Sequence, residues 1–175
     1  MLEGSRLLDA PPHHVEADEL MRIVRDFEFV VLFTSTPGFP GDIRLAAAMK
    51  DSNPRLKIAF VGPHVTVLPE RSLRDAPAVD FIVRREFDYA TVEFARGEPI
   101  ENIAGISYRR NGSIIHNPDR PPLADLDALP DERTFTRAIS MSGATTCPSC
   151  CTPTSPSTPR GAVRHSARFA CGRRR

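Results

Sequence analysis

Three short polar segments hold the residue types that are best suited to bind a ligand. They combine hydroxyls, glycines, an imidazole and opposite charges, and their members are Thr34, Ser35, Thr36 and Gly38, then Gly62, Pro63, His64 and Thr66, then Arg84, Arg85 and Glu86. Glycine lets a ligand approach the main chain, and hydroxyl and imidazole groups donate and accept hydrogen bonds. No segment matches GxGxxG or GxxxxGK(S/T), so nucleotide-binding and NTPase functions lose their main support.

Buried strands must position these segments. Each segment follows a short apolar run, and a further run lies near the start: Phe29–Phe33, Leu56–Val61, Asp80–Val83 and Arg6–Ala10. Amphipathic stretches between the runs predict helices at Val15–Phe27, at Ile43–Lys50 with Asp42 as its cap, at Pro69–Asp75 and at Tyr89–Arg96. This alternation predicts an α/β fold with an open parallel sheet. Such sheets bind ligands outside the carboxyl ends of their strands, where the three polar segments lie.

Two further parts follow this alternation. Residues 105–130 contain Asn111-Gly112 between two short apolar runs, which predicts a hairpin, and then a Pro-rich extended stretch. Residues 131–175 contain all four Cys and eight Arg with only two acids, whereas residues 1–130 contain 15 basic and 20 acidic side chains. We therefore divide the chain into a ligand-binding domain at 1–104, a hairpin and linker at 105–130, and a tail at 131–175 whose composition predicts disorder.

Targeting and membrane signals are not found in the sequence. The first residues lack the apolar core of a secretory signal, and the longest apolar stretch, Phe29–Phe33, is far shorter than the ~20 residues that span a bilayer. We expect a cytoplasmic protein with reduced thiols and no transmembrane segment. The basic end, Arg173–Arg175, has no aromatic residues interleaved with it, so no nucleic-acid partner is expected.

Other residues with chemical potential have simpler explanations. His13-His14 is a pair without further ligands, and Cys147, Cys150 and Cys151 lack a partner CxxC pair or a histidine at finger spacing. Glu86 and Asp88 have the residue type for acid–base chemistry, but a solvated loop explains them equally well. We therefore expect no catalytic residue and no metal ligand.

Taken together, the polar segments resemble a known family. Phe33–Gly38, Val61–Glu70 and Val83–Asp88 resemble the cobalamin-binding domain of cobalamin-dependent radical SAM enzymes, which is flavodoxin-like (Rossmann-like). Ile103–Arg109 and Asn117–Pro130 resemble the segment that leads from that domain into the radical SAM barrel, and the hopanoid-biosynthesis subgroup is the most similar. The resemblance covers about residues 5–130. It implies that all the residues of the three polar segments contact a corrinoid.

Within this resemblance, the role of His64 has two interpretations. It could approach the corrin or the cobalt, or it could be a loop histidine that is hydrogen-bonded to the main chain. The Asp-x-His-x-x-Gly motif, which supplies a lower cobalt ligand in other cobalamin domains, is absent. No axial histidine is therefore assigned.

Two departures from the family bear on the cofactor. The family usually carries Gly before the acid after the last strand, whereas this chain has Arg85 there, which could crowd the site. The family's first strand, with an Asn-Pro-Pro loop, should precede Arg6, so we expect it to be missing. Both departures predict that cobalamin binding is weak or lost.

The tail carries a second kind of departure. The family places a Cys-x3-Cys-x2-Cys motif some 30 residues after the linker, where three thiolates hold a 4Fe–4S cluster that binds S-adenosylmethionine. The tail instead has Cys147-Pro148-Ser149-Cys150-Cys151 and Cys171. Read one base out of step, however, three codon junctions with the family spacing can each encode Cys: Ala162/Val163, Ser166/Ala167 and Phe169/Ala170. We predict that the tail is translated out of frame.

The sequence thus predicts a corrinoid-binding domain fragment of a cobalamin-dependent radical SAM enzyme, with a hopanoid lipid as the parent's substrate. Without the barrel and the cluster motif it should not be catalytic alone, and the 4Fe–4S cluster and S-adenosylmethionine would belong only to the intact parent. Two alternatives remain open, a non-enzymatic flavodoxin-like interaction module and a nucleotide-sugar-binding domain.

Overall fold

The computed structural model describes residues 5–9, 17–122 and 168–174 of the chain. Among these residues, seven strands form one sheet in the order β1-β7-β2-β3-β4-β5-β6. The strands are β1 (Arg6–Asp9), β2 (Phe27–Phe33), β3 (Lys57–Val61), β4 (Phe81–Val83), β5 (Ile106–Arg110), β6 (Ser113–His116) and β7 (Arg168–Arg174). β2, β3 and β4 are parallel, whereas β5, β6 and β7 each run antiparallel to their neighbours.

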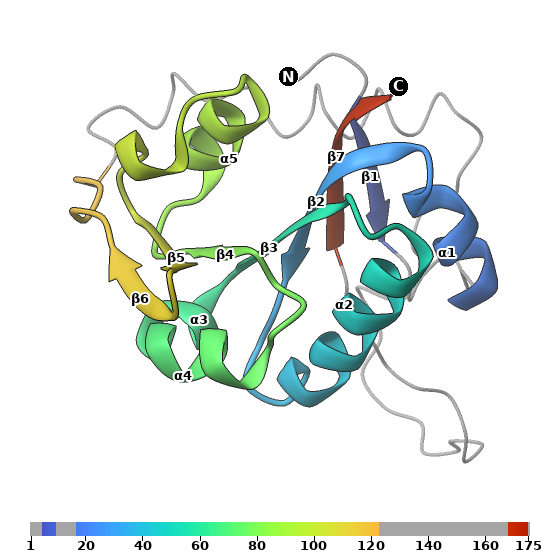
Figure 1. Ribbon diagram of the computed structural model, residues 1–175, viewed down its shortest axis with the longest axis horizontal. Helices are drawn as coiled ribbons and strands as arrows, with labels where there is room; N and C mark the ends of the chain where they lie inside the picture. The colour runs from blue at the N-terminus through green and yellow to red at the C-terminus, as the bar shows by residue number, and fades with distance from the viewer. Residues whose placement is uncertain (1–4, 10–16, 123–167, 175) are drawn as a thin grey trace, which may run out of the picture. The chain divides into compact units, whose positions relative to one another are not determined.

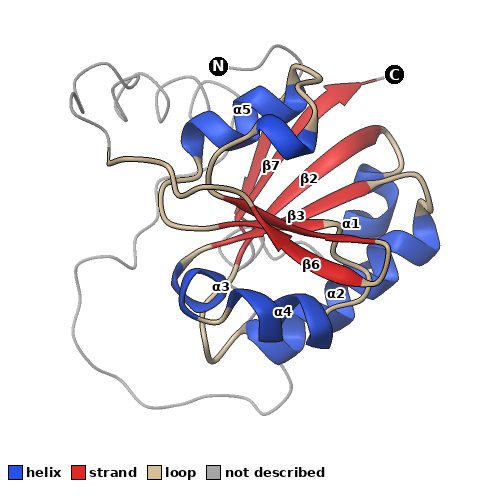
Figure 2. Ribbon diagram, turned by 60° about the vertical axis from the view of Figure 1, so that its left-hand side comes forward, coloured by secondary structure: helices blue, strands red, loops and turns tan. Residues whose placement is uncertain are grey.

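Helices cover both faces of the sheet. They are α1 (Ala17–Val24), α2 (Phe39–Ser52), α3 (Pro63–Val67), α4 (Pro69–Asp75) and α5 (Asp88–Ala95), with a 3-10 turn η1 (Ile100–Asn102). Figure 2 shows α5 on one face of the sheet and α2, α3 and α4 on the other. No helix in the described ranges is long and apolar enough to cross a membrane.

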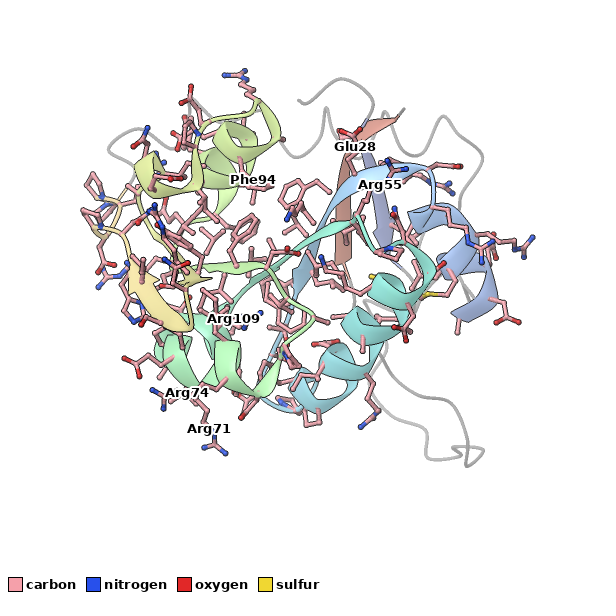
Figure 3. All side chains as sticks on the ribbon, in the orientation of Figure 1. Glu28, Arg55, Arg71, Arg74, Phe94 and Arg109 are labelled. Atoms are coloured by element: carbon pink, nitrogen blue, oxygen red, sulfur yellow. The ribbon has the colours of Figure 1, made fainter. Side chains whose placement is uncertain are left out.

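Each face has its own apolar core. On the face of α1 to α4, alternate strand residues such as Val30, Leu32 and Phe60 pack against Met49 and Leu73. On the opposite face, an aromatic cluster joins the sheet to α5: the ring centroid of Phe94 lies 4.8 Å from that of Phe29 and 4.4 Å from that of Phe81 (Figure 3). Both faces of β2 and β3 are therefore buried, which explains their continuous apolar runs.

The edge of the sheet at which β3 and β4 begin is held by charged side chains. The Asp80 carboxylate accepts a hydrogen bond from the Ile58 main chain at 2.9 Å and lies 2.7 Å from the Lys50 ammonium. Arg109, labelled in Figure 3, reaches from β5 to the end of α4 and donates to the main-chain oxygens of Leu73 and Pro77, among others. These contacts fix the start of β4 and so the direction in which it enters the site.

Most predicted elements are confirmed. The α/β sheet, its strands and the hairpin around Asn111-Gly112, with φ of 52° and 80°, are as expected. The second helix differs: it begins at Phe39, with Gly38 as the N-cap and Pro40 in its first turn. The prediction that Asp42 caps it is wrong, because Asp42 lies inside the first turn and is buried. The helix α3 was not predicted, since it is only five residues long and begins directly after Gly62.

The place between β1 and β2 is taken by β7. In the flavodoxin-like strand order 2-1-3-4-5, the first strand lies between the second and third strands and runs parallel to them. Here β7 holds this place and runs antiparallel to both neighbours, with Ala170 opposite Leu7 of β1 and Val31 of β2. For residues 168–174 the structure therefore differs from the predicted disordered tail. The predictions for 131–167, including the cysteines at 147, 150 and 151, lie outside the described residues, as do those for His13 and His14.

Candidate functional site

The three polar segments meet at one edge of the sheet. They begin directly after β2, β3 and β4, and each is tied to the next: the Thr34 N–H donates to the Val61 oxygen at 2.8 Å, and the Arg85 N–H donates to Thr66 Oγ1 at 2.9 Å. His64 Nδ1 lies 3.2 Å from Thr36 Oγ1. The predicted residues are therefore brought together, as expected for the carboxyl edge of parallel strands.

Thr34 shapes the first segment from inside the protein. Its side chain is fully buried, and its hydroxyl donates to the Asp42 carboxylate in α2 at 2.5 Å. The main-chain oxygen of Ser35 accepts from the N–H groups of Gly38 and Phe39 at 3.1 and 2.9 Å, which turns the chain into α2. Thr34 thus has a structural contact for its hydroxyl, while Ser35 is half-buried and Thr36 is exposed at the edge.

Gly62 brings the second segment close to the first. Its φ is +113°, and a Cβ atom at this position would lie 2.4 Å from the main-chain oxygen of Thr34. Only glycine combines this φ with so close an approach. Pro63 then starts α3, and Thr66 Oγ1 donates back to the Gly62 oxygen at 2.9 Å. The segment is therefore a compact cradle of main chain with little side-chain bulk.

His64 points one ring nitrogen at an enclosed place. Its ring packs against Phe39, with 4.1 Å between the ring centroids, and Nε2 is buried without a hydrogen-bond partner among the described residues. Burial lowers the pKa of His64, and the positive charge of Arg71 lowers it further. The imidazole is therefore neutral near pH 7, and Nε2 is enclosed with no hydrogen-bond partner in the described ranges. A buried polar atom without a partner is rare in folded proteins, and it calls for an explanation such as a bound water, an ion or a ligand.

The third segment begins with two arginines that behave differently. Arg84 is buried, and it donates to the main-chain oxygens of Ile106 and Asn117 at 3.1 and 2.6 Å and to the Asp119 carboxylate at 2.7 Å. Its donors are used inside the protein, so a ligand contact by Arg84 stays a prediction that the geometry does not favour. Arg85 instead has a left-handed φ of 60°, and its side chain is 59% exposed.

Glu86 follows at the start of the turn into α5. Its Oε2 atom is buried and has no hydrogen-bond partner in the part of the chain that is described. With His64 Nε2, it gives the edge two enclosed polar atoms that protein groups do not satisfy. A ligand with amide donors and acceptors would satisfy both.

Sequence reasoning missed the residues that support Arg84. Asn117 donates through its side-chain amide to the oxygens of Ile100 and Ile103, both at 2.7 Å, and Asp119 binds Arg84. Hydrogen bonding from Arg84, helped by its charge, lowers the pKa of Asp119. Asn-Pro-Asp in the linker was the only signal, and such residues are common in turns of any kind.

Metal chemistry has little support from the side chains. Within the described ranges, no group of three or more His, Cys, Asp or Glu side chains is arranged to hold a metal ion. The edge instead offers main chain, hydroxyls and isolated polar atoms.

The fold, with three polar segments that meet at the carboxyl edge of its parallel strands, is typical of an α/β ligand-binding domain. The family model of the B12 binding domain matches residues 5–95, just over half of the chain and all three polar segments. The chain therefore belongs to the B12-binding domain family.

Two further proteins are similar to this chain. An uncharacterized methyltransferase of Pyrococcus horikoshii is 26% identical over 131 residues, which cover 71% of this chain and 28% of that protein. The crystal structure of the N-terminal domain of a hypothetical protein from Thermotoga maritima is 20% identical, with a TM-score of 0.41, and the match covers 49% of this chain and 68% of that chain. The chain thus spans about a quarter of the length of the methyltransferase that it matches.

The residues present fit the ligand of this family. A corrin is a large flat ring fringed with amides, so it needs open main chain beside it and dispersed hydrogen-bonding groups around it. Gly62 supplies the open main chain, and His64 Nε2 and Glu86 Oε2 supply unsatisfied polar atoms. Large apolar side chains also remain exposed on the helices that begin here, with Val67 75% and Tyr89 37% exposed.

Proposed function

We propose that the carboxyl edge of β2, β3 and β4 binds a corrinoid, and that this corrinoid serves a methyl-transfer enzyme of the radical SAM type. The proposal that this edge binds a corrinoid rests on the family match over residues 5–95, which includes all three polar segments. The orphaned polar atoms of His64 and Glu86 support the same place in the fold.

The residues of the site would bind and orient the corrinoid. Ser35 and Thr36 offer hydroxyls, Gly62 and Pro63 offer main chain without bulk, and His64 Nε2 offers a neutral ring nitrogen. A bound cobalamin would supply a cobalt centre that can carry a methyl group. Because Nδ1 of His64 is engaged with Thr36 and the ring packs on Phe39, the imidazole is held in one orientation toward the ligand.

The enzyme context rests on the relatives. The Pyrococcus horikoshii protein is described as a methyltransferase, and the linker of this chain resembles the segment that enters a radical SAM barrel. A hopanoid lipid as substrate follows from the resemblance to that subgroup alone. The proposal predicts that the gene, read one base out of step across residues 158–172, encodes Cys-x3-Cys-x2-Cys. A nucleotide sequence without this motif would remove the radical SAM part and leave corrinoid binding untouched.

Titration with hydroxocobalamin tests the binding claim. We expect a saturable change in the corrin absorption, and a rise in melting temperature that grows with ligand, because a ligand at 100 times its Kd stabilises the native state by about 2.7 kcal/mol. His64→Ala should weaken the binding. Arg74→Gln should not, because Arg74 is 70% exposed on α4 and pairs only with Glu70 among the described residues. No spectral change at tens of micromolar protein would sink the claim, and stabilisation by UDP instead would favour a nucleotide-sugar domain.

A further inference from the structure

Arg85 brings a bulky cation to the edge where the corrinoid would lie. It follows β4 by one residue, its φ of 60° is a conformation that favours glycine, and its N–H is bonded to Thr66 of the α3 segment. An arginine here has the reach to cover the cradle formed by Gly62. Whether the site is open therefore depends on where this side chain is held.

The side chain of Arg85 is directed toward Asp119. Its Nη2 atom lies 3.6 Å from Asp119 Oδ2, while the other carboxylate oxygen, Oδ1, accepts from Arg84 Nε and Nη2 at 3.1 and 2.7 Å. Asp119 thus binds a buried arginine with one oxygen and an exposed arginine with the other. Asp119 belongs to the segment that follows β6. This segment lies on the β5 side of β4, whereas Gly62 and His64 lie on the β3 side of β4.

The segment that carries Asp119 is fixed by its main chain. The Asn117 N–H donates to Ile106 at 2.9 Å, and the Gly105 N–H donates to Pro118 at 2.8 Å. Arg120 pairs with Glu93 of α5. Asp119 is therefore a stationary acceptor, and Arg85 is the partner that is free to move, because it is exposed and bound by a single ion pair in the described structure.

We propose that Asp119 is a positioning residue that holds the Arg85 guanidinium on the β5 side of β4 and so keeps the corrinoid edge open. This inference rests on the proposed function of the same site. Asp119 touches no ligand in this scheme and acts through Arg85. When Asp119 carries no charge, the Arg85 side chain samples positions over the cradle and competes with the ligand for space.

A double-mutant cycle tests the proposal through the Kd for hydroxocobalamin. Asp119→Asn keeps an oxygen acceptor for Arg84 but removes the charge that holds Arg85, and we expect it to weaken binding about fivefold, the upper range for an exposed ion pair. Arg85→Gly suits the positive φ and removes the mobile side chain, so it should bind at least as tightly as the wild type. The variant with both substitutions should bind like Arg85→Gly alone.

The control is Glu101→Gln, which removes one partner of a similarly exposed ion pair with Arg110, at 3.8 Å. It should leave the Kd unchanged. Asp119→Asn should lower the melting temperature more than this control does, because it also weakens the pair with the buried Arg84, so the two variants are compared by their Kd. If Asp119→Asn costs the same affinity in the wild type and in the Arg85→Gly background, the proposal is overturned, because the carboxylate would then act independently of Arg85. A wild type that does not bind hydroxocobalamin would defeat the proposed function and this inference together, whereas binding with an additive cycle would defeat the inference alone.

Discussion

Two flanks of one sheet draw their strands from different distances along the chain. The β3–β5 flank, which comprises β3, β4, β5 and their helices, is bound by side chains that reach across the sequence, among them Arg84, Arg109 and Asn117. The β1–β2 flank, which comprises β1, β7 and β2, is joined by main-chain pairing to β7. Figure 1 shows β7, in red, between β1 and β2, far along the chain from both.

This difference locates the part of the molecule on which the site depends. The second and third polar segments leave β3 and β4, whose positions are set by Asp80, Arg109 and Arg84. The first segment leaves β2, which pairs with β3 over five residues from Phe29 to Phe33. The edge at which the three polar segments meet should therefore survive a disturbance of β7 better than a disturbance of Arg84.

The largest expected effect is from a break in β7. Ala170→Pro removes a main-chain donor from a strand that is paired on both sides. The acceptor left unsatisfied should cost about 1–3 kcal/mol of unfolding free energy, and the clash of the proline ring with the neighbouring strand adds to this. If the comparison holds, amide exchange will accelerate in β1 and at the outer side of β2, while β4 and β5 keep their protection and hydroxocobalamin titrates normally. Equal loss of protection in β4 would show that the two flanks do not differ.

Loss of Arg84 should have the second largest effect. Arg84→Met keeps much of the side-chain volume but leaves the oxygens of Ile106 and Asn117 without this donor and Asp119 without its main partner, at a cost of about 2–3 kcal/mol. Arg110→Met is the matched control, since Arg110 is exposed on the hairpin of β5 and β6 that Arg84 binds, and it lies 3.8 Å from Glu101. Chemical denaturation should separate the two variants clearly; similar midpoints would contradict the structural role of Arg84.

Pattern and turn chemistry predicted much of the β3–β5 flank. The apolar run of β3 and the Asn111-Gly112 turn each carry a local signal, and the polar residues that follow the strands predicted that three loops meet at one edge of the sheet. These features are local, because the burial of a strand and the type of a turn depend on residues that are adjacent in the sequence.

The contacts that complete the flank are not local. Arg84 binds Asp119, which lies 35 residues later in the sequence, and Arg109 binds main-chain oxygens at the end of α4, more than 30 residues earlier. Local patterns in the sequence predict neither contact. Asp42 looked like a cap because it stands near a helix start, but Thr34 binds its carboxylate and Gly38 takes the cap position. The place of β7 depends on pairing between distant segments, which sequence patterns specify weakly.

A smaller effect should come from the cradle glycine. Gly62→Ala adds both backbone strain and a contact with the Thr34 oxygen, whereas Gly97→Ala, at a φ of +93° with nothing within 4 Å of the added Cβ, adds strain alone. We expect about 1–2 kcal/mol from the strain in each variant. Gly62→Ala should cost more than this, because the atom that its Cβ meets is main chain and cannot rotate away. Hydroxocobalamin binding should fall only for Gly62→Ala. Equal stability of the two variants would mean that Thr34 gives way easily.

The smallest effect on the unfolding free energy should come from lowering the pH. Hydrogen bonding from Arg84 lowers the pKa of Asp119, so the stability that this carboxylate contributes is complete above about pH 4 and is lost as pH falls through its lower folded pKa. Burial lowers the pKa of His64, so the unfolded chain takes up this proton first, and stability starts to decline as pH falls below about 6.5.

Two variants distinguish the pH range in which His64 affects stability from the range in which Asp119 does. His64→Gln should flatten the unfolding free energy between pH 7 and 5 without changing its slope below pH 4, and Asp119→Asn should do the reverse. His64 lies on the β3–β5 flank and Asp119 is bound to that flank through Arg84, so amide exchange in β3 and β4 should follow the same two windows. A His64→Gln curve that runs parallel to the wild type between pH 7 and 5 would mean that burial does not keep the imidazole of the folded protein neutral in this range.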